Sequence, residues 1–289
     1  MMPIDAPATG FYLRVADAKI FVRIKGAGQA LLLLHGGGPG TSGASWLELM
    51  NACAPDRQFI APDFLGFGYS DAPEANYGNE KFINDTVELM KTLCLESVVL
   101  VGHSMGAAIA AGVAVRCPEL ISELVLIAPG GGSYGLDYHS PGIEQIARIS
   151  HEPTEANIRT LVELMSHRPE LHDGAVNKRM ALIARPGILA AQRYLQQSRQ
   201  DARRSGASGG ATLTEKIQSL AQPIALIWGQ HEAFNPVDLG PRIKAALPPH
   251  ARYYLIPDAG HNVHYDQPDA VARIFAEILD PALSVNSRS

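Results

Sequence analysis

The sequence predicts an α/β protein with a mainly parallel central sheet, helices on both faces and a helical lid inserted after the sixth strand. Three observations support this prediction. Short apolar runs alternate with segments of helical periodicity over most of the chain. The strand pattern stops between about residues 133 and 212. A sharp glycine-containing turn at 102–106 joins an apolar run to a helix of small residues.

The predicted strands are short apolar or alternating runs bounded by turn residues. The chain opens with a hairpin over Phe11–Lys25 that turns at Ala16-Asp17. The later strands are Ala30–Leu34, Gln58–Pro62, Val98–Val101, Ile121–Ile127, Pro223–Gly229 and Arg252–Ile256.

The predicted helices follow the spacing of apolar residues. Asn79–Leu93 and Pro268–Leu279 belong to the sheet-containing part, and Gly206–Gly210 is typical of a flexible return to it. We therefore expect a core domain, residues 1–132 and 213–289, and a lid, residues 133–212. The lid helices are expected over Ile143–Ile149, Ala156–Met165 and Ala175–Arg204.

The composition is that of a globular protein without a basic surface. Of 289 residues, 46% are hydrophobic and 18% charged, and the net charge is −5, so we expect neither a nucleic-acid nor a membrane partner.

The N-terminal residues lack a basic segment followed by an apolar run, which is the pattern of an export signal. Cys53, Cys94 and Cys117 have no C-x-x-C spacing and indicate buried free thiols in a reducing compartment. We expect a cytoplasmic enzyme with a small-molecule substrate, and a homodimer or higher homo-oligomer stays open.

Ser104 is the candidate nucleophile. It lies in a G-x-S-x-G turn between a β-branched strand and a helix of alanines and glycines, which is the setting of a nucleophile elbow. Flanking glycines allow the strained turn because a side chain there would collide with the neighbouring strand or helix. The alternative is an ordinary strand-to-helix turn.

A serine nucleophile needs a base and an acid that orients the base. His261 follows the last strand and Glu232 follows the strand before it, so both lie at carboxyl ends of strands. Ser104, Glu232 and His261 also occur in the serine, acid, histidine order of elbow hydrolases. Asp238 or Asp258 could replace Glu232 as the acid, and His261 could be a solvated loop residue.

The transition state needs preformed donors for its oxyanion. Met105 offers its backbone N–H directly after the nucleophile, and we expect the second donor to be Gly37 in the glycine-rich loop 35–40. A simple tight turn is the alternative for that loop. We expect no metal site, because His261 and His264, or His231 next to Glu232, lack an H-E-x-x-H helix or a cysteine.

These motifs resemble the α/β-hydrolase superfamily over nearly the whole chain. A narrower resemblance, to meta-cleavage product hydrolases of aromatic degradation, rests on loop 35–40, on the segment 60–69 and on a lid arginine within 177–180. It implies the α/β-hydrolase fold, no cofactor, and hydrolysis of a C–C bond in 2-hydroxy-6-oxo-hexa-2,4-dienoates. Arg179 would hold the carboxylate and dienolate end of the substrate; the alternative is an exposed helix arginine.

The chain departs from that family at four positions. His103 precedes the nucleophile where an asparagine is usual, Asn262 follows the histidine where a tryptophan is usual, and Trp46 replaces an asparagine. Glu232 stands where the family has aspartate. By the same resemblance the expected substrate-binding residues are Gly38, Trp46, His103, Arg179 and Asn262.

Three functions are compatible with these residues. The first is C–C bond hydrolysis of a dienoate. The second is an esterase, lactonase or amidase, because the triad specifies acyl chemistry and leaves the leaving group open. The third is a ligand receptor that cleaves its ligand slowly.

Overall fold

The computed structural model describes residues 10–73, 78–130, 134–204 and 213–279. Within these residues the strands form one eight-stranded sheet in the order β1-β2-β4-β3-β5-β6-β7-β8. The strand β2 runs antiparallel to β1 and β4, and all other neighbours are parallel. This arrangement confirms the predicted α/β architecture. The strands are β1 (Phe11–Val15), β2 (Ala18–Lys25), β3 (Gln29–Leu34), β4 (Arg57–Pro62), β5 (Val98–His103), β6 (Ile121–Ile127), β7 (Ile224–Gly229) and β8 (Arg252–Ile256).

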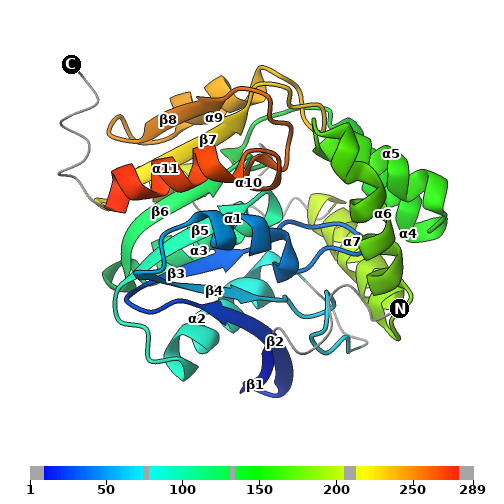
Figure 1. Ribbon diagram of the computed structural model, residues 1–289, viewed down its shortest axis with the longest axis horizontal. Coiled ribbons are helices and arrows are strands. Elements are labelled where there is room, and N and C mark those ends of the chain that lie inside the picture. Colours follow the sequence, from blue (N-terminus) through cyan, green and yellow to red (C-terminus); the bar gives the residue numbers. More distant parts are fainter. Residues whose placement is uncertain (1–9, 74–77, 131–133, 205–212, 280–289) are drawn as a thin grey trace.

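Helices cover both faces of the sheet (Figure 1). One group comprises α1 (Leu47–Ala52), α10 (Val263–Asp266) and α11 (Pro268–Leu279), which contact one another. A second group comprises α2 (Asn79–Thr92), α3 (Met105–Arg116) and α8 (Leu213–Ile217), with α3 in contact with both others. The chain also forms α9 (Leu239–Ala246) and the 3-10 helices η2 (Gly43–Trp46) and η3 (Pro118–Leu120). Because the central strands are covered on both faces, β5 and β7 are buried along their whole length.

Between β6 and α8 the described residues form four helices, which make a separate block beside the carboxyl ends of the strands (Figure 1). We call α4 (Pro141–His151), α5 (Glu155–Met165), α6 (Pro169–Ile183) and α7 (Ile188–Arg204) the helical insertion. Ser140 and Thr154 cap α4 and α5 by accepting hydrogen bonds from backbone N–H groups. The insertion has its own apolar cluster, which includes Ile146 and Leu161.

The single helix predicted over Ala175–Arg204 was wrong, because the structure divides this segment into α6 and α7. Pro186 lacks a backbone N–H, and Gly187 adopts φ +79°, so the chain turns there. The predicted domain boundaries and the return 206–210 fall within or next to segments outside the described residues, so the division into core and lid stays a prediction.

The three cysteines are free, as predicted, but their predicted burial was wrong. Cys94 is exposed, and Cys53 and Cys117 are half-buried. Each follows the C-terminal end of a helix, where the chain reaches the surface before the next strand or turn. In the described part of the chain, no helix is both long and apolar enough to span a membrane.

Candidate active site

The turn between β5 and α3 holds Ser104 in a strained conformation. Its φ of 52° and ψ of −113° are unusual for a residue with a side chain. A Cβ on Gly102 would lie 2.3 Å from the carbonyl oxygen of Gly106, and a Cβ on Gly106 would lie 2.2 Å from that of Leu34. Glycine is therefore required at both positions. Ser104 is the one residue of this turn that is partly exposed, as a nucleophile must be.

His261 and Glu232 form a buried hydrogen-bonded pair. Nδ1 of His261 lies 2.8 Å from Oε2 of Glu232, and both side chains are fully buried. The other carboxylate oxygen of Glu232 accepts hydrogen bonds from the backbone N–H groups of Phe234, at 2.9 Å, and Asn235, at 3.0 Å. Because a carboxylate only accepts, Nδ1 carries a proton, and in the neutral form of this tautomer Nε2 holds the lone pair. Nε2 has no hydrogen-bond partner among the described residues and can accept a proton from the nucleophile.

The two alternative acids lie elsewhere. Asp238 lies 3.5 Å from the guanidinium of Arg242, and Asp258 lies 3.9 Å from Nε2 of His231. Both aspartates are exposed. Of the three candidate carboxylates, only Glu232 contacts His261.

His103 connects the nucleophile turn to the histidine loop, a contact that the sequence did not indicate. Its Nε2 lies 3.0 Å from the backbone carbonyl oxygen of His261. Burial lowers the pKa of His103 well below its usual value, so the ring is neutral and its Nε2–H donates to that carbonyl. The predicted substrate-binding role would have to use the remaining Nδ1, which faces Gly36.

The glycine-rich loop lies against the nucleophile turn. A Cβ on Gly36 would lie 3.4 Å from Cβ of Ser104. The hydroxyl of Thr41 donates to the carbonyl of Gly37 at 2.9 Å and fixes that peptide. Gly37 directly follows Gly36, and Met105, the first residue of α3, directly follows Ser104. The two predicted oxyanion donors thus come from adjacent segments.

His35 holds this loop to the segment after β4, and sequence reasoning assigned it no such role. Its Nδ1–H donates to the carbonyl of Gly36 at 2.7 Å, and its Nε2 accepts the backbone N–H of Phe64 at 3.0 Å. The bond that Nε2 accepts needs a neutral ring, and burial lowers the pKa of His35 to about 3. The neighbouring Asp63 forms a buried ion pair with Arg23 at 2.6 Å.

Arg179 enters the site from α6 of the insertion. Only 8% of it is exposed, so the exposed-arginine alternative was wrong. Its Nη1 donates to the carbonyl of Pro39 at 2.7 Å and to Oγ1 of Thr41 at 3.0 Å, and its Nη2 lies 3.3 Å from Sδ of Met165. No carboxylate of the described residues lies within ion-pair distance of it. Burial lowers its pKa to about 10 because desolvation disfavours the charge.

Helices α4 and α6 of the insertion pack against the glycine-rich loop. The left-handed Gly40, with φ +74°, lies so close to α6 that a Cβ would be 2.7 Å from Cα of Arg179. A Cβ on Gly38, with φ +95°, would lie 3.1 Å from the side chain of Ile146 in α4. Gly38 therefore faces the insertion, and its expected contact with substrate stays a prediction.

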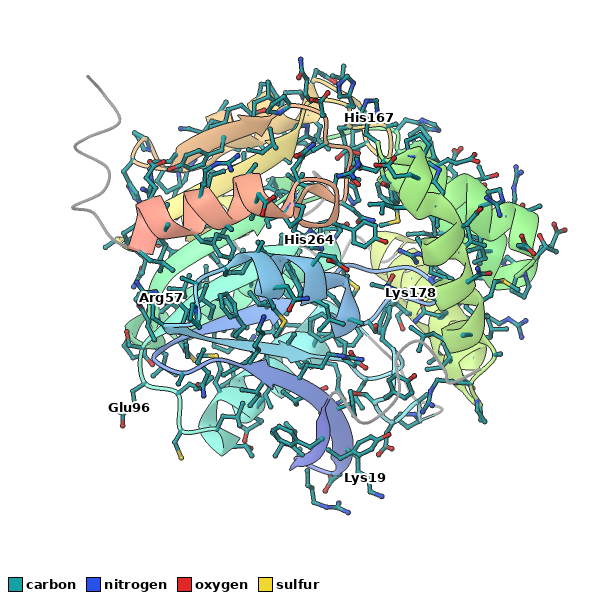
Figure 2. All side chains as sticks on the ribbon, viewed as in Figure 1. Lys19, Arg57, Glu96, His167, Lys178 and His264 are labelled. Atoms are coloured by element: carbon teal, nitrogen blue, oxygen red, sulfur yellow. The ribbon has the colours of Figure 1, made fainter. Side chains whose placement is uncertain are left out.

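Trp46 packs against His264, which is labelled in Figure 2, beside this site; the ring centroids are 4.0 Å apart and the planes are inclined by 31°. Both are fully buried, and burial lowers the pKa of His264 to about 3. Neither Nε1 of Trp46 nor either ring nitrogen of His264 has a hydrogen-bond partner among the described residues. His264 also lies 4.7 Å from the ring of His103. The predicted role of Trp46 in substrate binding stays a prediction, and the sequence indicated no role for His264 beside it.

Asn262 and Asp266 tie the histidine loop to the end of α5. The backbone N–H of Asn262 donates to the carbonyl of Met165 at 2.7 Å. The buried carboxylate of Asp266 accepts from the hydroxyl of Ser166 at 2.6 Å and from the backbone N–H groups of His167 and Gly260. The position of His261 thus depends on where the insertion joins the core.

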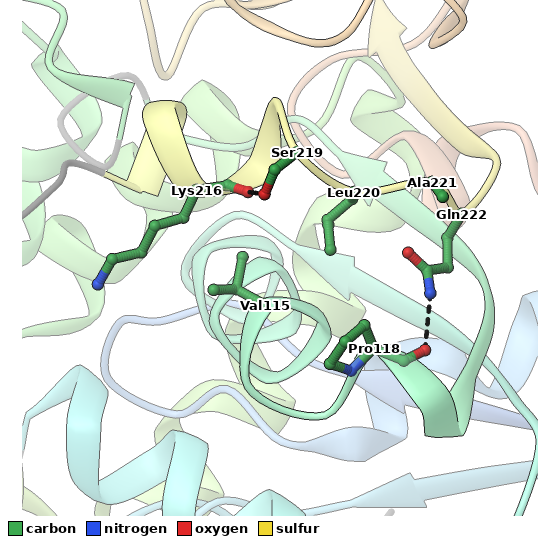
Figure 3. Close-up of a pocket in the computed structure, with 7 residues that line it drawn as sticks. All are labelled: Val115, Pro118, Lys216, Ser219, Leu220, Ala221 and Gln222. Atoms are coloured by element: carbon green, nitrogen blue, oxygen red, sulfur yellow. Dashed lines mark hydrogen bonds between the residues drawn. The ribbon is translucent and has the colours of Figure 1, made fainter.

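A separate pocket of about 300 Å³ lies at the other end of α3 (Figure 3). Val115 and Pro118 line one side, and the segment 216–222 lines the other. Its internal bonds are structural, such as the amide of Gln222 donating to the carbonyl of Pro118 at 2.7 Å. Because α3 has 12 residues, this pocket lies about 18 Å from Ser104 and takes no part in the triad chemistry.

Comparisons with known proteins agree with this fold. The family described as "alpha/beta hydrolase fold" matches residues 29–268. The chain is 33% identical to 2-hydroxymuconate semialdehyde hydrolase of Pseudomonas sp. (strain CF600) over 64% of this chain and 65% of that protein. It is 26% identical to 2-hydroxymuconate semialdehyde hydrolase of Pseudomonas putida over 99% of both chains.

The solved structures include 2-hydroxy-6-oxo-6-phenylhexa-2,4-dienoate hydrolase from Rhodococcus sp. strain RHA1. It matches with a TM-score of 0.82 at 22% identity and covers 93% of this chain and 97% of its own. At this level of identity the likeness shows a shared fold.

Proposed function

Because the chain belongs to the alpha/beta hydrolase fold family, we propose that Ser104, His261 and Glu232 form the catalytic triad of a serine hydrolase. Nε2 of His261 takes the hydroxyl proton as the oxygen of Ser104 attacks a carbonyl carbon of the substrate. Glu232 stabilises the imidazolium through the 2.8 Å bond at Nδ1. The N–H groups of Gly37 and Met105 donate to the oxyanion that forms.

The substrate that we propose is a 2-hydroxy-6-oxo-dienoate, the class cleaved at a C–C bond during aromatic degradation. The observation that carries this proposal is the buried charge of Arg179, which has carbonyl, hydroxyl and thioether neighbours but no carboxylate among the described residues. A buried cation is costly unless it is paired. A carboxylate on the substrate would supply the partner, and the two relatives reported above carry names of this class.

The same cation suits the chemistry of C–C cleavage. The dienoate reacts through a ketonised form, and the bond that breaks leaves its electron pair on the fragment that holds the carboxylate. Arg179 stabilises the negative charge that develops on this fragment while the oxyanion donors stabilise the charge on the other side of the bond. The triad, the oxyanion donors and Arg179 divide these tasks without a cofactor.

Ester, lactone or amide hydrolysis is the second candidate, and Trp46 favours it. The resembled dienoate hydrolases have an asparagine at this position, whereas Trp46 fills it with a ring packed on His264. An ester without an acid group would need neither that asparagine nor Arg179.

The experiment offers the purified protein a coloured 2-hydroxy-6-oxo-dienoate and p-nitrophenyl acetate in parallel. Loss of the dienoate colour at a kcat/KM at least about a hundredfold above that for the ester supports the proposed substrate, since this corresponds to about 2.7 kcal/mol of preferential transition-state stabilisation. A preference for the ester would support the second candidate. Tight binding of the dienoate without turnover would support a ligand receptor and contradict both.

The insertion α4–α7 acts as the lid of a core made of residues 1–132 and 213–289, because it covers the glycine-rich loop through Gly38 and Gly40. An exposed free thiol at Cys94 suits the reducing cytoplasm. Whether the chain forms a homodimer or a higher homo-oligomer stays open, and light scattering in solution tests it.

A further inference from the structure

Three side chains with metal-binding atoms meet on the surface where the helical insertion joins the core. His167, labelled in Figure 2, lies between α5 and α6. His231 lies in the loop after β7, and Asp258 follows β8. One ligand atom from each of the three lies within 4.8 Å of the others. All three side chains are exposed. They are far apart in the sequence, so no spacing motif pointed to them.

We propose that His167, His231 and Asp258 bind a divalent d-block cation, with Zn²⁺ as the simplest case. Two imidazoles and one carboxylate form a ligand set suited to Zn²⁺, Co²⁺ and Ni²⁺, whereas Mg²⁺ and Ca²⁺ prefer oxygen ligands alone. Three protein ligands leave room for water at a fourth position. This inference does not depend on the substrate proposed above.

Side-chain rotation alone can bring the three ligand atoms to binding distance of one ion. Two ligands of a tetrahedral Zn²⁺ lie about 3.3 Å apart, and Nε2 of His231 already lies 3.9 Å from Oδ1 of Asp258. The rings of His167 and His231 stack with centroids 3.8 Å apart and planes inclined by 7°. One ring must turn so that both lone pairs point at the same ion, and exposed side chains make such turns readily.

The backbone under each ligand is fixed. The N–H of His167 donates to the buried carboxylate of Asp266 at 2.9 Å. The N–H of His231 donates to the carbonyl of Ala259 at 2.8 Å, which joins the two loops that carry His231 and Asp258. The ligands are therefore held near one another before an ion arrives, which lowers the entropic cost of binding.

A bound ion would link the helical insertion to the two loops that carry Glu232 and His261. His231 directly precedes Glu232, and Asp258 lies three residues before His261. His167 belongs to the turn that must move if the insertion swings away from the core. The cation would therefore hold this turn against the core and slow its opening, without contacting the substrate.

The test measures binding of Zn²⁺ to the apo protein by titration calorimetry and of Co²⁺ by its visible absorption. The wild-type chain is expected to bind one ion, and His167→Ala and His231→Ala each to weaken that binding at least about tenfold, as expected for loss of a ligand worth 1.4 kcal/mol or more. Asp258→Asn should weaken it as well, and asparagine tolerates the positive φ of 52° at this position. His250→Ala, which removes an exposed histidine before β8, is the matched control and should bind like the wild type.

Hydrogen exchange then tests the effect on the insertion. Saturating Zn²⁺ is expected to slow amide exchange over residues 166–170 in the wild type and in His250→Ala, but not in His231→Ala. Circular dichroism establishes that each variant is folded. Equal Zn²⁺ affinity in the wild type, His167→Ala and His231→Ala, or no binding by any of them, would overturn the proposed site. Binding without slower exchange would overturn its role in holding the insertion.

Discussion

Replacing Arg179 by alanine should separate dienoate hydrolysis from simple ester hydrolysis. The guanidinium is buried and has donors to spare, because Nη1 alone makes both of its contacts to oxygen, at Pro39 and Thr41. We expect Arg179→Ala to lower kcat/KM for the dienoate by at least about a hundredfold and to change p-nitrophenyl acetate hydrolysis by less than about threefold.

The magnitude follows from the contacts that a substrate carboxylate would make. A hydrogen bond to a charged group contributes about 1.5–3 kcal/mol, and a planar guanidinium can make two of them to one carboxylate. Two bonds at the lower end give about 3 kcal/mol, which is about 150-fold in rate. Arg179→Lys should recover only part of this, since an ammonium lacks the paired donors.

The assay is steady-state kinetics on both substrates, followed by the dienoate colour and by nitrophenol release. Lys178→Ala is the matched control, because it removes a positive charge from the neighbouring residue of the same helix (Figure 2). Equal losses on both substrates in Arg179→Ala would mean that the residue only holds α6 on the glycine-rich loop. Full dienoate activity in Arg179→Ala would refute its role as the carboxylate partner.

Three further predictions concern the acid, the elbow and the buried histidines. Glu232→Gln should lower kcat about a hundredfold or more because an amide cannot stabilise the imidazolium, whereas Asp238→Asn should be nearly silent; the reverse order in steady-state kinetics would reassign the acid. Gly106→Ala should abolish folding, because its Cβ would lie 2.2 Å from a backbone oxygen, and a native circular dichroism spectrum would contradict this. Burial lowers the pKa of His35 and of His264 to about 3 in the folded chain. As the pH falls below about 6.5, these histidines are therefore protonated in the unfolded chain while they stay neutral in the folded one. The free energy of unfolding should therefore be fully retained above that pH and fall by about 2 kcal/mol per histidine at pH 5, as measured by urea denaturation, and His264→Phe should remove one histidine's share.

The sequence predicted those parts of the site that depend on local structure. The elbow at Ser104 is visible because its glycines are required by contacts within one strand, turn and helix. Glu232 and His261 could be predicted from their places at the ends of adjacent strands, since parallel strands bring their carboxyl ends to one edge of the sheet.

The sequence did not predict contacts that depend on how distant loops meet. The bond from His103 to the carbonyl of His261 joins residues 158 positions apart, and neither residue type reveals it. The same holds for Asp266, whose carboxylate links the insertion to the histidine loop. The break between α6 and α7 was missed because the flanking segments both have helical spacing, although Pro186 and Gly187 marked the place.

The most direct test of the account compares the wild type with Ser104→Ala on a 2-hydroxy-6-oxo-dienoate. We expect the wild type to remove the dienoate colour with turnover. We expect Ser104→Ala to bind the dienoate and to leave it uncleaved, apart from a residual rate about a thousandfold above that in water. Turnover by Ser104→Ala within a few-fold of the wild-type rate would contradict the assignment of the nucleophile and with it the proposed mechanism.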